Sequence, residues 1–91
     1  MARFEWDPKK AVVNLAKHRV HFADAVGVFE DDRAITIEDE STDEERFKTI
    51  GMDFLGQVLV VVYTYRGDVI RLITARRANA PQRAAYERKR R

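Results

Sequence analysis

The chain contains no cysteine, which excludes disulfide bonds and metal sites built from thiolates. It has only two histidines, and two histidines alone do not make a metal site. No apolar run comes near the roughly 20 residues that a membrane-spanning helix needs, and no signal peptide is recognisable at the N-terminus. We therefore expect a bacterial cytoplasmic protein that uses no cofactor and does not contact a membrane.

The length and composition are those of a small globular protein. Of the 91 residues, 45% are hydrophobic and 35% are charged. A chain of this size forms one domain with a thin core and marginal stability. We predict a single domain spanning residues 1–91, without repeats or a linker.

The net charge of +2 hides a strong separation of charge along the chain. Residues 30–45 hold nine carboxylates and one arginine, a balance of −8, whereas residues 76–91 hold seven basic residues and one acid, a balance of +6. A basic end is typical of a surface that faces a polyanion such as a nucleic acid. The alternative is that the two poles attract each other or are simply solvated.

The stretch from Val58 to Arg77 predicts a β-hairpin at the centre of the fold. Gly67 can take the positive φ of a tight II′ turn, so we expect Arg66 to pair with Val69. Continuing this ladder predicts three further pairs: Thr64 with Arg71, Val62 with Ile73, and Val60 with Ala75. Both faces are apolar in their middle, so an arginine in this hairpin must reach an open face or meet an anion.

The N-terminal part predicts a short edge strand at residues 3–6 and two helices. Asp7 followed by Pro8 predicts a first helix that runs to about His18. Its apolar stripe comprises Ala11, Val12, Leu15 and Ala16, and the other side carries Lys10, Asn14, Lys17 and His18. A second amphipathic helix begins at Phe22 and ends at residues 30–32.

Residues 34–37 and 45–52 predict two more strands before the hairpin. A last helix follows the hairpin, capped by Asn79 and anchored by Tyr86. The predicted order is β-α-α-β-β-β-β-α. It defines an α+β fold, with two N-terminal helices packed on an antiparallel sheet of four or five strands and a C-terminal helix.

Several short motifs follow one another in an order that resembles one family. They are Phe4 to Pro8, Asn14 with Lys17 and His18, Glu45 with Arg46, Thr49 to Gly51, Ile70 with Arg71, Ala75 to Arg77, and Arg83 with Tyr86 and Glu87. Together they extend over nearly the whole chain and resemble the BrnT family of ribonuclease toxins, whose compact fold is similar to that of RelE toxins. The chain departs from the family pattern at Arg19, where glycine is usual, and at Gln82, where glutamate is frequent.

The resemblance implies a toxin of a type II toxin–antitoxin system that cleaves RNA and inhibits translation. It also implies a BrnA-type antitoxin with a ribbon-helix-helix domain, which neutralises the toxin in a complex expected to be a heterotetramer. DNA would be contacted only through the antitoxin. Two alternatives remain open: a non-catalytic nucleic-acid-binding module and a protein-interaction module, each using the basic C-terminal region.

Cleavage of RNA without a metal ion requires cations that stabilise the charge developing on the phosphate. Arginine makes bidentate contacts with phosphate oxygens and stays charged throughout. We predict that the phosphate ligands gather in one pocket and are Arg76, Arg77, Arg46 and Arg71. The other predicted RNA contacts are Lys48, which shares a strand face with Arg46, and Arg83. The alternative for the arginines is pairing with the acidic loop at residues 38–45.

Three further side chains are candidates for proton transfer or base contact. Histidine suits acid–base chemistry near neutral pH, so His18 is a catalytic candidate, although a histidine at a helix end more often caps or packs. Glu45 is a candidate base, and its alternative is a solvated position at the start of a strand. Tyr86 can stack on a base or donate a proton, and its alternative is to anchor the last helix to the sheet.

Overall fold

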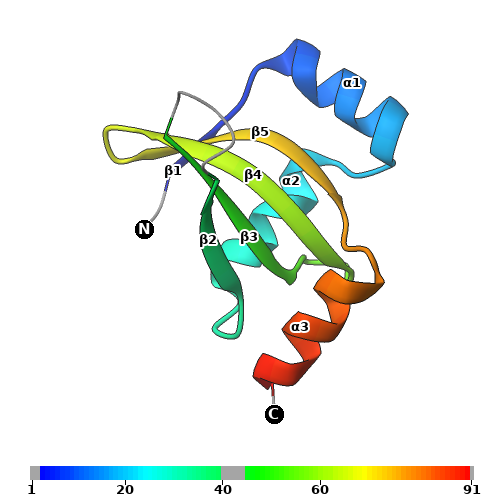
Figure 1. Cartoon of the computed structure of the whole chain (residues 1–91). Coiled ribbons are helices and arrows are strands. Elements are labelled where there is room, and N and C mark those ends of the chain that lie inside the picture. The colour runs from blue at the N-terminus through cyan, green and yellow to red at the C-terminus, as the bar shows by residue number, and fades with distance from the viewer. Residues whose placement is uncertain (1–2, 40–44, 91) are drawn as a thin grey trace.

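The computed structural model describes residues 3–39 and 45–90, without the side chains of residues 39, 89 and 90. The elements in chain order (Figure 1) are β1 (Arg3–Glu5), α1 (Pro8–His18), α2 (Phe22–Ala25), the 3₁₀ helix η1 (Val26–Glu30), β2 (Ile35–Asp39), β3 (Arg46–Met52), β4 (Val58–Arg66), β5 (Val69–Arg77) and α3 (Ala80–Arg90). The predicted order is confirmed, with the second helix short and continued by η1. None of the helices in these residues is long and apolar enough to cross a membrane.

The five strands form one sheet in the order β1-β5-β4-β3-β2. Strands β2 to β5 pair antiparallel, as predicted, but β1 runs parallel to β5. The prediction of a wholly antiparallel sheet is therefore wrong, and the sheet is mixed. The helices α1 and α2 separate β1 from the other strands, and a connection of that length lets a strand join the sheet in either direction.

The turn of the central hairpin forms as predicted. Gly67 has a φ of 61°, whereas Asp68 after it does not have a positive φ, which fits a II′ turn. The two predicted pairs next to the turn are confirmed: Arg66 with Val69 and Thr64 with Arg71.

Beyond the turn, a β-bulge shifts the register of the hairpin. Tyr63 lies opposite Leu72, but its neighbour Val62 lies opposite Thr74, so Ile73 is an extra residue in β5. The shift makes two predicted pairs wrong: Val62 with Ile73 and Val60 with Ala75. An extra residue reverses the alternation of side chains, so the rest of β5 presents each residue to the face opposite to the prediction. Ala75 consequently joins the core opposite Val61, and Arg76 lies opposite Val60.

The helices cover the two faces of the sheet unequally (Figure 1). α2 and η1 lie against one face, here called the inner face, and bury the main core with it. That core includes Phe22, Ala25, Val28, Leu59, Val61, Tyr63, Leu72 and Ala75. α3 packs on the opposite face, here called the outer face, where Tyr86 contacts a smaller cluster of Ile50, Val60 and Ala78.

Helix α1 lies along the edge of β5. The short strand β1 pairs only with Val69–Arg71, so no strand in residues 3–39 and 45–90 lies beside the later part of β5 on that side. Asn14 fills part of this gap, because its Nδ2 donates to the carbonyl oxygen of Ala75 at 2.9 Å and its Oδ1 accepts from the Ala75 N–H at 3.0 Å. Nδ2 also donates to the carbonyl oxygen of Val20 at 3.0 Å. The amide therefore takes the place of a strand partner at an otherwise open edge.

The buried side of α1 differs from the prediction. Asn14, predicted on the outward side, is 4% exposed, whereas Val12, predicted in the buried apolar stripe, is 69% exposed. The physical reason is that α1 meets the polar backbone edge of a strand at this point. A residue facing that edge needs hydrogen-bonding groups more than it needs apolar surface.

The predicted caps of the first and last helices are confirmed. The Asp7 side chain accepts from the N–H of Lys9 at 2.9 Å, and Asn79 Oδ1 accepts from the N–H of Gln82 at 2.9 Å. Gln82 Oε1 in turn accepts from the N–H of Asn79 at 3.0 Å, which completes a capping box. Arg19 ends α1 in the left-handed conformation, with a φ of 59°, although it is not glycine.

Candidate nucleic-acid interface

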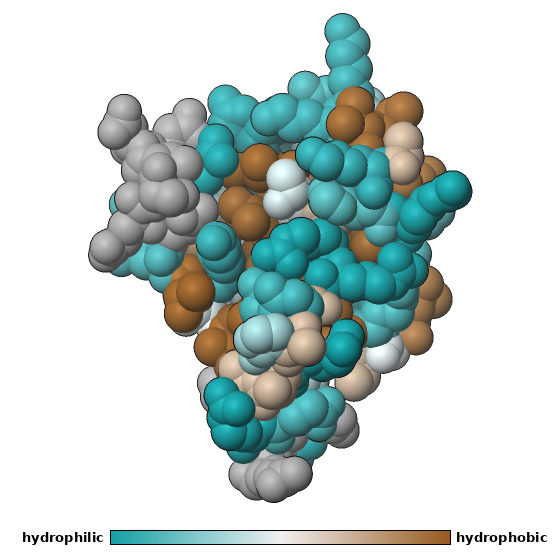
Figure 2. All heavy atoms as spheres, turned by 45° about the vertical axis from the view of Figure 1, so that its right-hand side comes forward, coloured by the Kyte–Doolittle hydropathy of each residue, from teal (hydrophilic) through white to brown (hydrophobic). Residues whose placement is uncertain are grey.

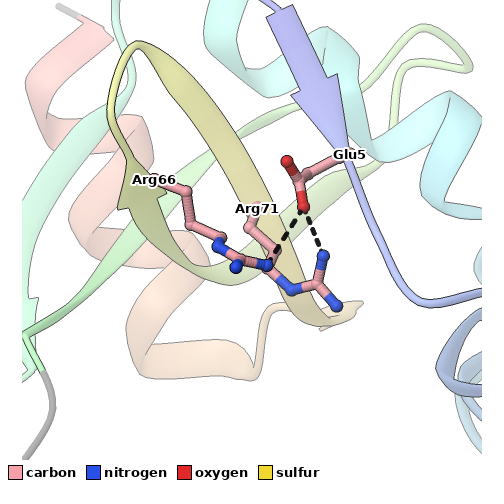
Figure 3. A network of polar contacts seen from close by, with 3 residues as sticks. All are labelled: Glu5, Arg66 and Arg71. Atoms are coloured by element: carbon pink, nitrogen blue, oxygen red, sulfur yellow. Dashed lines mark hydrogen bonds and ion pairs between the residues drawn. The ribbon is translucent and has the colours of Figure 1, made fainter.

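Arg71 is held by a local acid at the end of the sheet that carries the hairpin turn. Its Nη1 donates to Glu5 Oε2, and Arg66 Nη1 lies 3.6 Å from the same oxygen (Figure 3). The parallel pairing of β1 with β5 brings this acid into position, because Glu5 lies directly opposite Arg71. The predicted alternative of a local ion pair therefore applies to Arg71, although the acid comes from β1 and not from the loop at 38–45.

Glu45 and Arg46 lie at this same end, where β3 begins. The backbone oxygen of Glu45 accepts a hydrogen bond from Thr64 Oγ1 at 2.7 Å, and Glu45 is exposed, as its alternative reading expected. Partial burial raises the pKa of the Tyr65 phenol most, and the adjacent Tyr63 raises it further. Tyr65 therefore stays protonated at neutral pH and offers no base there.

This end of the sheet is far from Arg76 and Arg77. Arg77 lies six positions after Arg71 in β5, which is roughly 20 Å at the rise of an extended strand. The four predicted arginines consequently do not converge on one pocket, because Arg46 and Arg71 lie at one end of the sheet and Arg76 and Arg77 at the other. A single phosphodiester cannot contact both pairs.

Three arginines lie where β5 leads into α3, with Arg76 opposite Val60 of the outer face and Arg77 opposite Leu59 of the inner face, and we call them the arginine junction: Arg76, Arg77 and Arg83. Arg76 Nη1 donates to Gln82 Oε1 at 3.1 Å and to the carbonyl oxygen of Arg77 at 3.3 Å. Arg77 Nε donates to Gln57 Oε1 at 2.8 Å. Gln82 thus binds Arg76 through a neutral amide.

The charge of the arginine junction is not neutralised within the described residues. Arg83 Nη1 donates to the carbonyl oxygen of Ala78 at 3.4 Å, so the partners that the structure describes for the three guanidinium groups are neutral oxygens. The ion pairs with Glu5 involve two other arginines, Arg66 and Arg71, at the opposite end of the sheet. Three cations without an acid create a positive potential that attracts anions.

Arg77 links the arginine junction to the end of α1. Its Nη1 donates to the carbonyl oxygen of His18 at 3.3 Å. Beside His18 the surface is hollowed into a cavity of about 320 Å³, here called the α1–β5 groove. The groove is lined by Lys9, Lys10, Val13, Asn14, Lys17, His18, Ile73 and Thr74, so every ionisable group in its lining is basic. Hydrophilic side chains continue across this side of the molecule between α1 and α3 (Figure 2).

Lys48 lies on the outer face, in a cross-strand row with Val62 and Thr74. Thr74 is exposed and also lines the α1–β5 groove. Arg76 follows Thr74 two residues later, and therefore on the same face of β5. Lys48, Thr74 and Arg76 therefore form a surface on the outer face that connects the groove with one arginine of the junction.

Tyr86 does not belong to this surface. It is 1% exposed beneath α3, and its hydroxyl donates to Asp31 Oδ2 at 2.6 Å. Base stacking, as predicted for Tyr86, would require α3 to leave the sheet. The structure instead agrees with the alternative, in which Tyr86 anchors the last helix.

The lysines of the groove, Lys9, Lys10 and Lys17, are not among the residues that the sequence predicts for the site. A signal was present, since Lys10 and Lys17 share one side of α1 with Asn14 and His18. The sequence predicts that this side of α1 faces solvent, whereas in the structure Asn14 faces the edge of β5.

Comparisons with known proteins agree with this fold. The crystal structure of the Brucella abortus ribonuclease toxin, BrnT, is similar to this chain, with a TM-score of 0.69 and 24% identity over 87% of this chain and 99% of that chain. The model of a family described as the ribonuclease toxin, BrnT, of type II toxin–antitoxin systems matches residues 6–81. The comparison with curated protein sequences gives no match.

The family match extends over most of the chain and defines a class, the toxins of type II toxin–antitoxin systems. Within this class, the chain belongs to the BrnT family. Membership of a type II system implies a protein antitoxin as partner.

Proposed function

We propose that this protein is an endoribonuclease that cleaves RNA without a metal ion and thereby inhibits translation. The observation that carries the proposal is the arginine junction, whose three guanidinium groups have only neutral partners in the described residues. A phosphodiester supplies the negative charge that this group lacks. Arginine binds phosphate oxygens through paired N–H groups and keeps its charge throughout the reaction.

In the proposed reaction, the 2′-hydroxyl of one ribose attacks the adjacent phosphorus. The O2′–P bond forms and the P–O5′ bond breaks, which leaves a 2′,3′-cyclic phosphate and a free 5′-hydroxyl. A base takes the proton of the 2′-hydroxyl, and an acid or water protonates the leaving oxygen. Arg76 and Arg77 stabilise the charge that develops on the non-bridging oxygens.

We assign proton transfer to His18, because this residue lines the groove and its backbone oxygen accepts a hydrogen bond from Arg77. Lys48 and Arg83 contact neighbouring phosphates of the RNA. The other predicted residues lie too far away to share the chemical step: Arg46, Arg71 and Glu45.

Single-stranded RNA incubated with the protein in EDTA tests this proposal. We expect fragments with 2′,3′-cyclic phosphate ends, and no cut where the attacking ribose is 2′-deoxy. Arg76→Ala/Arg77→Ala should slow cleavage by about a hundredfold or more, since each residue stabilises the transition state. The control Arg33→Ala/Arg66→Ala removes the same charge away from the arginine junction and should keep its activity.

Other outcomes separate the alternatives. If the wild-type protein binds RNA but never yields products, the protein is a non-catalytic RNA-binding module. If cleavage appears only when Mg²⁺ is added, metal independence is wrong although the nuclease stands. Equal cleavage by the junction variant and its control would remove the arginines from the mechanism.

We further propose that the antitoxin is a BrnA-type protein with a ribbon-helix-helix domain. It would bind as a heterotetramer, cover the arginine junction and alone contact DNA. Membership of the type II class supports this proposal, as does the positive charge of the arginine junction, which has no acidic partner among the described residues. Co-expression with the candidate antitoxin should give a complex that does not cleave RNA; a complex that still cleaves at the wild-type rate would contradict the proposal.

A further inference from the structure

The α1–β5 groove has an apolar floor in addition to its basic side chains. Val13 contributes from α1 and Ile73 from β5. Val13 is 62% exposed, so this apolar surface is open to solvent in the isolated chain. A site for a bare phosphate needs only donors and positive charge. The floor therefore indicates a ligand with an apolar part as well as a negative charge.

Ile73 lies in the groove for an identifiable reason. It is the extra residue of the β-bulge, where the strand twists and a side chain is redirected. In an unbroken ladder Ile73 would lie opposite Val62 and would point out of the sheet with it. The bulge thus contributes an apolar side chain to the edge where α1 passes.

Asn14 lines the groove but cannot help it to distinguish one base from another. Both N–H groups of its amide are used, one for Val20 and one for Ala75, and its oxygen accepts from Ala75. An amide with no free N–H offers a ligand no paired donor and acceptor. Asn14 therefore adds no base-specific contact, which leaves the positive charge and the apolar floor as the main basis of recognition in the groove.

We propose that the α1–β5 groove holds one unpaired nucleotide of RNA, with its base on Val13 and Ile73 and its flanking phosphates on Lys10 and Lys17. The two lysines are seven residues apart in α1, or roughly 10 Å along the helix axis. This separation lets them contact the phosphates on both sides of one nucleotide. That the ligand is RNA rests on the function proposed above.

The shape of the groove favours a nucleotide of a single strand. A base inside a duplex is stacked on both faces, so it cannot pack on Val13 and Ile73. The cavity of about 320 Å³ is at the small end of the range for ligand sites. We therefore expect the groove to select single-stranded RNA with little preference among bases.

The test uses a single-stranded oligonucleotide in which every ribose is 2′-O-methylated, so that binding is measured without cleavage. The variant is Val13→Glu and the matched control is Val12→Glu. Both valines are exposed and adjacent in α1, but only Val13 lines the groove. We expect Val13→Glu to weaken binding about tenfold or more, and Val12→Glu by less than about threefold.

Two further measurements use the basic side chains and the free nucleotide. Lys10→Ala/Lys17→Ala should lower the slope of log affinity against log salt by about two, since each lysine contacts one phosphate. In amide NMR spectra, adenosine 5′-monophosphate should shift Val13 and Ile73, whereas inorganic phosphate should leave both unshifted. A duplex of the same sequence should bind more weakly than the single strand.

Equal losses in Val13→Glu and Val12→Glu, or equal binding of single strand and duplex, would overturn the inference. A poly-glutamate peptide gives a further test. If the peptide binds the wild type but not Val13→Glu, while the oligonucleotide binds both equally, the inference is overturned, because the groove would then serve an acidic protein segment. The two proposals fail separately. If the groove binds as expected but RNA is never cut, the nuclease fails alone. If RNA is cut but the two valine variants behave alike, the groove fails alone.

Discussion

A single amide, that of Asn14, fastens the first helix to the sheet. Its three hydrogen bonds satisfy both backbone groups of Ala75 and the carbonyl group of Val20 in a buried position. A buried backbone group that loses its partner costs about 1–3 kcal/mol. This side chain is therefore more important to the fold than its polar character in the sequence implies.

Replacing Asn14 by alanine should lower the free energy of unfolding by about 2–4 kcal/mol, because the two Ala75 groups lose their partner. Urea denaturation measures the effect. Lys17→Ala is the control, since Lys17 lies one turn further along α1 and is exposed. A loss for Asn14→Ala no larger than that of the control would mean that water replaces the amide at the strand edge.

Arg19 gives a prediction of the opposite sign. It holds a left-handed φ of 59° at the end of α1, a conformation that costs a residue with a Cβ atom about 1–2 kcal/mol. Arg19→Gly should therefore raise the free energy of unfolding by about 0.5–1 kcal/mol, after the greater freedom of glycine in the unfolded chain is deducted. Arg19→Ala keeps the Cβ atom and should show no such gain. Thermal denaturation of both variants decides whether backbone strain or the arginine charge matters.

At the level of elements, η1 is packed tightly against the turn between β3 and β4. A Cβ atom on Gly27 would lie 2.5 Å from the backbone nitrogen of Phe54 and 2.9 Å from the carbonyl carbon of Asp53. Backbone atoms of a hydrogen-bonded turn cannot move aside as a flexible side chain does. The contact between η1 and this turn therefore requires glycine at position 27.

We expect Gly27→Ala to destabilise the protein by about 3 kcal/mol or more, as overpacking against backbone does at its upper range. Gly67→Ala is a graded control, because its Cβ would meet open space and only its φ of 61° opposes the change, at about 1 kcal/mol. Chemical denaturation should rank the two variants in this order. The reverse order would show that η1 shifts easily and that turn strain dominates.

The sequence is informative about elements that follow local rules. Gly67 marks the hairpin turn, Asp7 and Asn79 cap their helices, and the order of elements follows from hydrophobic periodicity. The bulge at Ile73 has no local signal, because both registers place apolar residues in the middle of the strand. The sequence also does not show which side of α1 faces the protein, since Asn14 is buried by its hydrogen bonds to Ala75, which is distant in the sequence.

The residues of the candidate site likewise divide into those that local sequence rules predict and those that depend on the assembled fold. The sequence indicates that arginines near the end of the hairpin lack a place in the core, and Arg76 and Arg77 indeed form part of the arginine junction. It does not indicate that Arg71 meets Glu5, because the parallel pairing of β1 is a property of the assembled sheet. Nor does it reveal the α1–β5 groove, which exists only once α1 lies along the edge of β5.

For the molecule as a whole, the thin core predicts a strong dependence on the partner. Binding of an antitoxin to the folded toxin alone adds about 2.7 kcal/mol of stability when the partner is at 100 times its dissociation constant. We expect the complex to melt at a higher temperature than the free toxin, by an amount that grows with partner concentration. Scanning calorimetry at two concentrations measures this shift. Coincident melting of toxin and complex at both concentrations would contradict it.

The extra residue in β5 determines how this chain is to be compared with its relatives. A relative whose fifth strand lacked that residue would turn the side chain aligned with Arg76 toward the inner layer and the one aligned with Arg77 outward. An ungapped alignment would then equate positions with different neighbours. The role of a residue should therefore be transferred between such proteins by superposing their structures, and not by its position in the aligned sequences.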